Sequence, residues 1–207
     1  MPQSPKFLNR YTSLPIALDV LTNKHITLLS PNTWEDRNDA YYLERYREQK
    51  KLGSVLAICF STQSETFHHW RVFSSGMSGV CIEFNPERLL ASIHGKNNFK
   101  SGYVNYSLVG NVKKTRPQVE EWPFLKRKPY QDEAEYRILY ESHTPNDQLL
   151  NVSINLAAIQ KITFSPWMPL PIMRSLAKII MNFDECRDID VRRSNLLDTA
   201  GWKHAID

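Results

Sequence analysis

Two glutamates and an arginine alternate within residues 133–137, and their types and spacing could do chemistry. In an extended strand, residues i, i+2 and i+4 share one face, so Glu133, Glu135 and Arg137 are expected to project together. Two carboxylates about 6–7 Å apart along a strand are costly to hold without a cation, a ligand or catalytic work. A solvated strand face with a Glu-Arg pair is the structural alternative. The segment therefore indicates either a catalytic site or a salt-bridged strand.

The apolar pattern of the chain predicts the elements that must position these residues. The nearly continuous apolar run 54–61 predicts a central strand. Other strands are expected at 25–29, 80–84, 99–107, 133–140 and 159–164, and helices at about 14–23, 39–51, 63–73, 118–125 and 169–183. Short strands mixed irregularly with helices predict an α+β fold. We expect a single compact domain over residues 1–207, with a mixed or antiparallel central sheet and peripheral helices.

Composition sets limits on the class of protein. The chain has 207 residues, of which 42% are hydrophobic and 23% charged, as in ordinary soluble globular proteins. No apolar run is long enough to span a membrane, and the first residues lack a signal-peptide core. The three cysteines show no C-x-x-C spacing, which predicts reduced thiols in the cytoplasm. Basic residues cluster between Lys96 and Lys128 and could meet the phosphates of a nucleic acid, although solvated lysines explain them too.

Four motifs follow one another in an order that resembles a family of bacterial and phage proteins catalogued as a domain of unknown function. They are C-F-S at 59–61, H-W-R-V-F at 69–73, G-V-C-I-E-F at 79–84 and E-A-E-Y-R at 133–137. The resemblance spans residues 8–165 and leaves 166–207 as a C-terminal helical extension. Some members lie beside phage-resistance genes, which implies a role as a toxin or a phage-defence effector.

A second resemblance is to the arginine-type ADP-ribosyltransferases, which carry an arginine on the first strand, Ser-Thr-Ser on a middle strand and Glu-x-Glu further on. Here Arg10 lies on the first apolar segment, Ser61 and Thr62 end the central strand, and Glu133 and Glu135 follow. The resemblance implies an ADP-ribosyltransferase-like fold with NAD as a substrate and no metal. The acceptor, a protein or a nucleic acid, is left open.

The resemblance also implies roles for single residues. Cleavage of the NAD glycosidic bond passes through an oxocarbenium-like state, as glycoside hydrolysis does. Glu135 is expected to stabilise that cation, Glu133 to orient or deprotonate the acceptor, and Ser61 to fix Glu135. The residues assigned to cofactor binding are Arg10, which suits the pyrophosphate, together with Tyr11, Thr62, His69 and Trp70.

Two other functions stay open. In a metal-dependent nuclease, Asp36 or Asp39 would join Glu133 and Glu135 around Mg²⁺, although the lysine of an E-x-K motif is missing beside them. In a non-enzymatic binding module that senses a phage or host partner, the carboxylates would form a salt-bridge ladder. Core packing is the structural alternative for Trp70.

Overall fold

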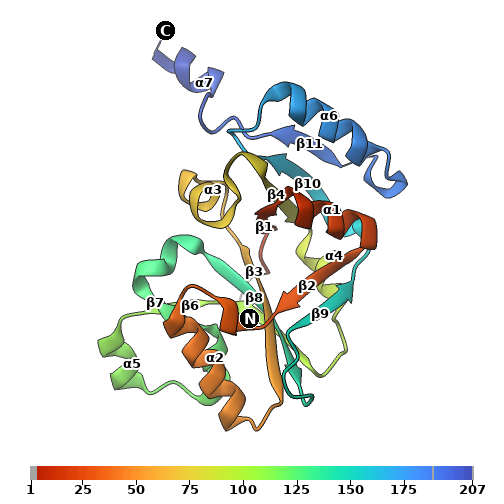
Figure 1. Ribbon diagram of the computed structural model, residues 1–207. Helices are drawn as coiled ribbons and strands as arrows, with labels where there is room; N and C mark the ends of the chain where they lie inside the picture. The colour runs from red at the N-terminus through yellow and green to blue at the C-terminus, as the bar shows by residue number, and fades with distance from the viewer. Residues whose placement is uncertain (1–3, 188, 207) are drawn as a thin grey trace. The chain divides into compact units, whose positions relative to one another are not determined.

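The structure is a computed structural model that describes residues 4–187 and 189–206, and the chain divides into two compact units (Figure 1). Unit 1 comprises Met1–His25, Gln63–Ser92 and Ile154–Asp207, and unit 2 comprises Ile26–Thr62 and Ile93–Ser153. Both units combine helices with mostly antiparallel strands, which confirms the predicted α+β class. The expectation that residues 1–207 form a single domain stays a prediction.

The described residues of unit 1 form four strands in the order β11-β10-β4-β1. Their bounds are β1 (Leu8–Ser13), β4 (Gly79–Phe84), β10 (Ile159–Phe164) and β11 (Asp190–Arg193), and only the β10–β11 pair is parallel. The helices are α1 (Leu14–Asn23), α3 (Phe67–Phe73), α4 (Pro86–Ala91), α6 (Leu170–Met181) and α7 (Ala200–Lys203). Short 3₁₀ turns lie at Gly76–Ser78, Leu156–Ala158, Asp184–Cys186 and His204–Ile206. The segment expected to be a helical extension therefore also contains a strand, β11.

Unit 2 contains five strands in the order β5-β8-β3-β2-β9 and a separate parallel pair, β6 with β7. The strands are β2 (His25–Leu29), β3 (Ser54–Ser61), β5 (Phe99–Tyr103), β6 (Asn105–Ser107), β7 (Leu125–Arg127), β8 (Glu135–Ser142) and β9 (Leu149–Ser153). The helices are α2 (Arg37–Gln49) and α5 (Val109–Thr115), with 3₁₀ segments η1 (Pro31–Thr33), η3 (Val119–Phe124) and η4 (Lys128–Glu133). This unit carries the segment with the two glutamates.

Strands β3 and β8 pair along their whole length, from Ser54 opposite Ser142 to Ser61 opposite Glu135. Most of β3 is buried, as its apolar run predicts. Helix α2 covers one face of this pair, because Leu43 and Tyr46 join the strand residues Val55, Ala57 and Leu139 in one apolar core. The ends of β3 and β8 are therefore fixed relative to each other and to α2.

Most predicted elements are confirmed, and the differences have local causes. The helix expected at 63–73 begins only at Phe67, because Thr66 caps it through a hydrogen bond from the His69 amide to its hydroxyl. The helix expected at 118–125 is a 3₁₀ segment, since Pro123 lies inside it and lacks an amide donor. The strand expected at 99–107 is split into β5 and β6. No helix in the described ranges is long and apolar enough to cross a membrane.

Candidate functional site

The two glutamates do not lie on one strand, so that part of the sequence prediction is wrong. Strand β8 begins at Glu135, whereas Glu133 ends the 3₁₀ segment η4. Ala134 between them has φ 45° and ψ 52°, a left-handed conformation that is uncommon for a residue with a side chain. Its carbonyl accepts hydrogen bonds from the amide and the hydroxyl of Thr62, both at 2.8 Å. Thr62 thus holds the turn that separates the glutamates.

Arg137 is fully buried and joins two carboxylates from different elements. Its guanidinium contacts Glu135 Oε1 at 2.7 and 2.8 Å, and binds Asp39 of α2 in a bidentate pair at 2.7 and 3.1 Å. It also donates to the Pro123 carbonyl at 2.6 Å, and it lies 4.9 Å from the centre of the Trp34 ring. Such fork-shaped, charge-assisted contacts fix both carboxylates in place.

Lys126 of β7 completes a group that we call the charged cluster: Asp39, Lys126, Glu133, Glu135 and Arg137. Lys126 Nζ pairs with Glu133, lies 3.1 Å from Glu135 Oε2 and lies 3.6 Å from Asp39 Oδ2. The lysine that the sequence lacks next to the glutamates is therefore supplied by another strand. Sequence reasoning had named Asp39 beside the glutamates only as a metal ligand, and it missed Lys126, whose only signal was the basic stretch 96–128.

The backbone register places Ser61 directly opposite Glu135 on the neighbouring strand. Directly opposite side chains in an antiparallel pair are neighbours on one face, with Cβ atoms about 4.5–5.5 Å apart. The Glu135 amide donates to the Tyr106 hydroxyl at 2.9 Å. The predicted neighbourhood of Ser61 and Glu135 thus has a structural basis in the β3–β8 pairing.

The surroundings move the pKa values of the two glutamates in opposite directions. Burial raises the pKa of Glu135, but the charges of Arg137 and Lys126 and a hydrogen bond from Cys59 lower it to about 2. Burial, together with the nearby Glu135, raises the pKa of Glu133 to about 7 despite the contact with Lys126. Paired carboxyl groups with separated pKa values are the arrangement that divides acid–base work between two residues.

The charge balance of the cluster agrees with the raised pKa of Glu133. Three carboxylates face two cations, so the cluster has one excess negative charge when every group is ionised. Burial raises the pKa of Asp39 as well, although Arg137 opposes the shift. A proton on Glu133 makes the cluster neutral, and Glu133 is therefore the group through which the cluster exchanges a proton.

The predicted site residues fall into two groups, one in each unit. Ser61, Thr62, Glu133 and Glu135 are brought together in unit 2, as described above, and Arg10, Tyr11, His69 and Trp70 lie in unit 1.

The aromatic residues of the unit 1 group pack against one another. Tyr11 stacks on His69 with ring centres 5.2 Å apart, and meets Trp70 edge-on at 5.2 Å. Trp70 is fully buried, and its indole N–H donates to Glu65 at 2.9 Å. Tyr11 and Trp70 form a core cluster with Cys81, against which Trp167 and Leu196 pack. The packing alternative for Trp70 thus has direct structural support.

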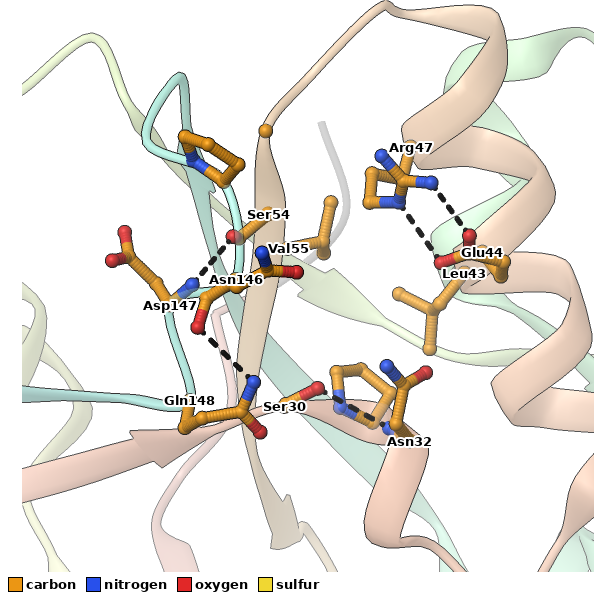
Figure 2. Close-up of a pocket in the computed structure, with 13 residues that line it drawn as sticks. Ser30, Asn32, Leu43, Glu44, Arg47, Ser54, Val55, Asn146, Asp147 and Gln148 are labelled. Atoms are coloured by element: carbon orange, nitrogen blue, oxygen red, sulfur yellow. Dashed lines mark hydrogen bonds and ion pairs between the residues drawn. The ribbon is translucent and has the colours of Figure 1, made fainter.

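A polar pocket of about 200 Å³ lies elsewhere in unit 2, between α2 and the segment that joins β8 to β9 (Figure 2). Figure 2 shows Arg47 paired with Glu44, and the Asp147 amide donating to the Ser54 hydroxyl. The hydrogen bond from Asp147 to Ser54 is 2.9 Å long. Because these polar groups already bond to one another, their hydrogen bonds hold the surrounding loops in place and leave few polar groups to bind a ligand. Among the described residues, no group of three or more His, Cys, Asp and Glu side chains could hold a metal ion.

Comparisons with known proteins give one family and one set of solved structures. Residues 69–138 match a family described as "Protein of unknown function (DUF2971)". This range contains three of the four motifs named above, which supports the predicted resemblance to a family of unknown function, and it leaves the motif at 59–61 outside. No curated protein matches the chain.

The similar solved structures include three of DarT from Thermus sp. 2.9. Its complex with NAD+ has a TM-score of 0.47 and 10% identity, covering 94% of this chain and 98% of that chain. Its complex with ADP-ribosylated ssDNA has a TM-score of 0.47 and 10% identity, with 93% and 95% covered. The complex with carba-NAD+ has a TM-score of 0.45 and 11% identity, with 93% and 97% covered. The chain is thus similar to DarT over nearly the full length of both proteins, at low identity.

Proposed function

We propose that this protein is an NAD-dependent enzyme, an ADP-ribosyltransferase or an NAD glycohydrolase, and that the charged cluster is its catalytic centre. The observation that carries the proposal is the pair Glu133 and Glu135, which share Lys126 in one buried cluster while Arg137 contacts Glu135 alone. These surroundings raise the pKa of Glu133 and lower that of Glu135. Glycosidic bond cleavage through an oxocarbenium-like state needs one carboxylate that stays ionised and one group that exchanges a proton near neutral pH. The two glutamates meet these two needs.

Four residues of the cluster and the neighbouring Ser61 each have a part in the proposal. Glu135 remains a carboxylate and stabilises developing positive charge on the ribose. Glu133 accepts a proton from the acceptor nucleophile, which is a side chain, a nucleotide or water. Arg137 and Lys126 contact the two glutamates so that the two carboxyl groups differ in protonation state. Ser61 keeps Glu135 in its rotamer from the opposite strand.

The residues of unit 1 enter the proposal in two ways. A role for Arg10 in binding the pyrophosphate rests on the resemblance to arginine-type ADP-ribosyltransferases alone, in which a guanidinium binds phosphate bidentately. We assign Tyr11, His69 and Trp70 a positioning role, because their packing supports β1, the strand that carries Arg10. Thr62 has a positioning role too, through its hydrogen bonds to Ala134. These five residues were the ones assigned to cofactor binding.

The residues fit Mg²⁺ poorly, which weighs against the nuclease alternative. Asp39 and Glu135 are bridged by the Arg137 guanidinium, and Lys126 is a cationic partner of Glu133 and Glu135. The protein's own cations thus occupy the carboxylate oxygens that a metal ion needs. The binding-module alternative predicts the same contacts with no catalysis, and a comparison of enzymatic activity separates it from the proposal.

The biological setting belongs to the same proposal. A toxin or phage-defence effector in the bacterial cytoplasm is supported by the resemblance of the four motifs to a family with members beside phage-resistance genes. An acceptor in nucleic acid is supported by the basic residues between Lys96 and Lys128.

Release of nicotinamide from NAD tests the proposal. The wild-type protein is expected to release nicotinamide, and Glu135→Gln to lower the rate at least 100-fold, because it removes the charge that stabilises the cation. Glu120→Gln is the matched control, since Glu120 lies in the same unit with its side chain 62% exposed. A wild-type protein that releases no nicotinamide, or a Glu135→Gln variant as fast as wild type, would overturn the proposal.

A further inference from the structure

A second and larger pocket in unit 2 lies beside the charged cluster. It has a volume of about 470 Å³ and is lined by residues of α2, α5, β6 and β7. Lys126 lines this pocket and at the same time pairs with Glu133 and Glu135. Anything bound in the pocket is therefore within reach of a residue that contacts both candidate catalytic glutamates.

The charge of the lining favours an anion. Its charged members are all cations, namely Arg37, Lys113, Lys126 and Arg127, and no carboxylate lines the pocket. Lys126 is neutralised by the glutamates, and Arg127 lies 3.8 Å from Asp36. Within the described ranges 4–187 and 189–206, neither Arg37 nor Lys113 has an ion-pair partner. Two cations without an ion-pair partner among the described residues thus line the pocket, Lys113 from α5 and Arg37 from α2, and Arg37 also donates to the Asn32 carbonyl at 3.2 Å.

The rest of the lining favours a flat aromatic group. Tyr41 is 61% exposed, and its ring meets that of Tyr42 at an angle of 56° with centres 6.4 Å apart. The two rings are not stacked on each other, so a further planar group can stack on them. Val112 adds apolar surface from α5. Nucleobases stack on tyrosine rings while arginine and lysine take the phosphate, a pairing common in nucleotide recognition.

We propose that this pocket binds a nucleoside phosphate, with its base on Tyr41 and its phosphate between Arg37 and Lys113. The inference rests on the proposed function in one respect, because the bound nucleotide is part of a molecule that reacts at the charged cluster. Two sources have this chemistry: the adenylate half of NAD, and one nucleotide of a single-stranded nucleic acid. Binding itself needs no turnover and can be measured separately from catalysis.

Binding is measured by isothermal titration calorimetry with AMP, NAD and a single-stranded oligonucleotide of about ten nucleotides. At least one is expected to bind wild type, and Tyr41→Ala to weaken that binding about tenfold, the loss of one base–aromatic stack. Lys113→Ala is expected to weaken it several-fold, and increasingly so at low salt. Two controls are expected to change binding less than twofold: Lys114→Ala, the next residue on α5, and Tyr103→Ala, which is exposed on β5.

The outcomes distinguish the two sources of the nucleotide, and they separate a failure of this inference from a failure of the proposed function. Binding of AMP and NAD but not the oligonucleotide assigns the pocket to the dinucleotide, and binding of the oligonucleotide assigns it to the acceptor. The inference is overturned if none of the three binds, or if Tyr41→Ala and Lys113→Ala bind as wild type does. Binding with this pattern of variants but no nicotinamide release refutes the proposed function alone.

Discussion

The buried guanidinium of Arg137 provides the sharpest test of the charged cluster as a structural unit. Arg137→Met keeps much of the side-chain length and removes the charge. The change leaves Asp39 and Glu135 without their main partner, and both are buried, with exposed fractions of 2% and 5%. Breaking a buried ion pair by removing one partner costs about 3–5 kcal/mol, because the remaining charge is uncompensated. That is a large part of a typical unfolding free energy of about 5–15 kcal/mol.

Urea unfolding at pH 7 measures this loss directly, and Arg45→Met is the control. Arg45 pairs with Glu48 on the surface of α2, where both side chains are 43% exposed, so its loss is expected to stay below about 0.5 kcal/mol. The loss at Arg137 is also expected to shrink at pH 4, since protonation neutralises the orphaned carboxylates. A loss below about 1 kcal/mol at pH 7 would refute the account of Arg137 as the centre of the cluster.

Three further changes test other parts of the account. The unfolding free energy of wild type is expected to fall as pH rises from 4.5 to 7, because folded Glu133 holds a proton that the unfolded chain releases above its ordinary pKa of 4.5. Urea unfolding of Glu133→Gln at several pH values should lack this decline, and parallel profiles would contradict the pKa assignment. Glu135, whose pKa is lowered to about 2, stabilises the fold above pH 4.5 and loses that effect as pH falls toward 2. Thr62→Val removes one hydrogen bond to Ala134 and should lower the free energy of unfolding by about 1 kcal/mol, which is measured in a thermal melt. Ala134→Gly should stabilise the fold by about 0.5–1 kcal/mol in the same melt, since glycine adopts φ 45° without strain; destabilisation would speak against the left-handed turn.

The strands could be predicted wherever the apolar pattern was continuous. Residues 54–61 read as a buried strand because nearly every side chain is apolar, and β3 has these bounds. The break between Glu133 and β8 could not be read from the sequence. The left-handed residue there is Ala134, whereas the residues that usually signal a positive φ are glycine and asparagine.

The ion pairs of the charged cluster were equally hidden, for a different reason, although Asp39 was named beside the glutamates in the nuclease alternative. Asp39 comes from α2 and Lys126 from β7, and no local spacing relates either residue to Glu135. Such contacts depend on tertiary packing, which periodicity does not encode. The neighbourhood of Ser61 and Glu135 was proposed from motif order, and its physical cause is the antiparallel register of β3 and β8. Core packing was the alternative weighed for Trp70, and the structure places its side chain in a core cluster of unit 1.

The pH dependence of nicotinamide release tests the central claim most directly, because it asks whether the two glutamates divide the work. With Glu133 as the base, the wild-type rate is expected to rise with pH and to level off above an apparent pKa near 7. Glu133→Gln is expected to be slower and to lose that rise, while Glu120→Gln keeps the wild-type profile. A Glu133→Gln variant with the wild-type rate and the wild-type profile would contradict the account.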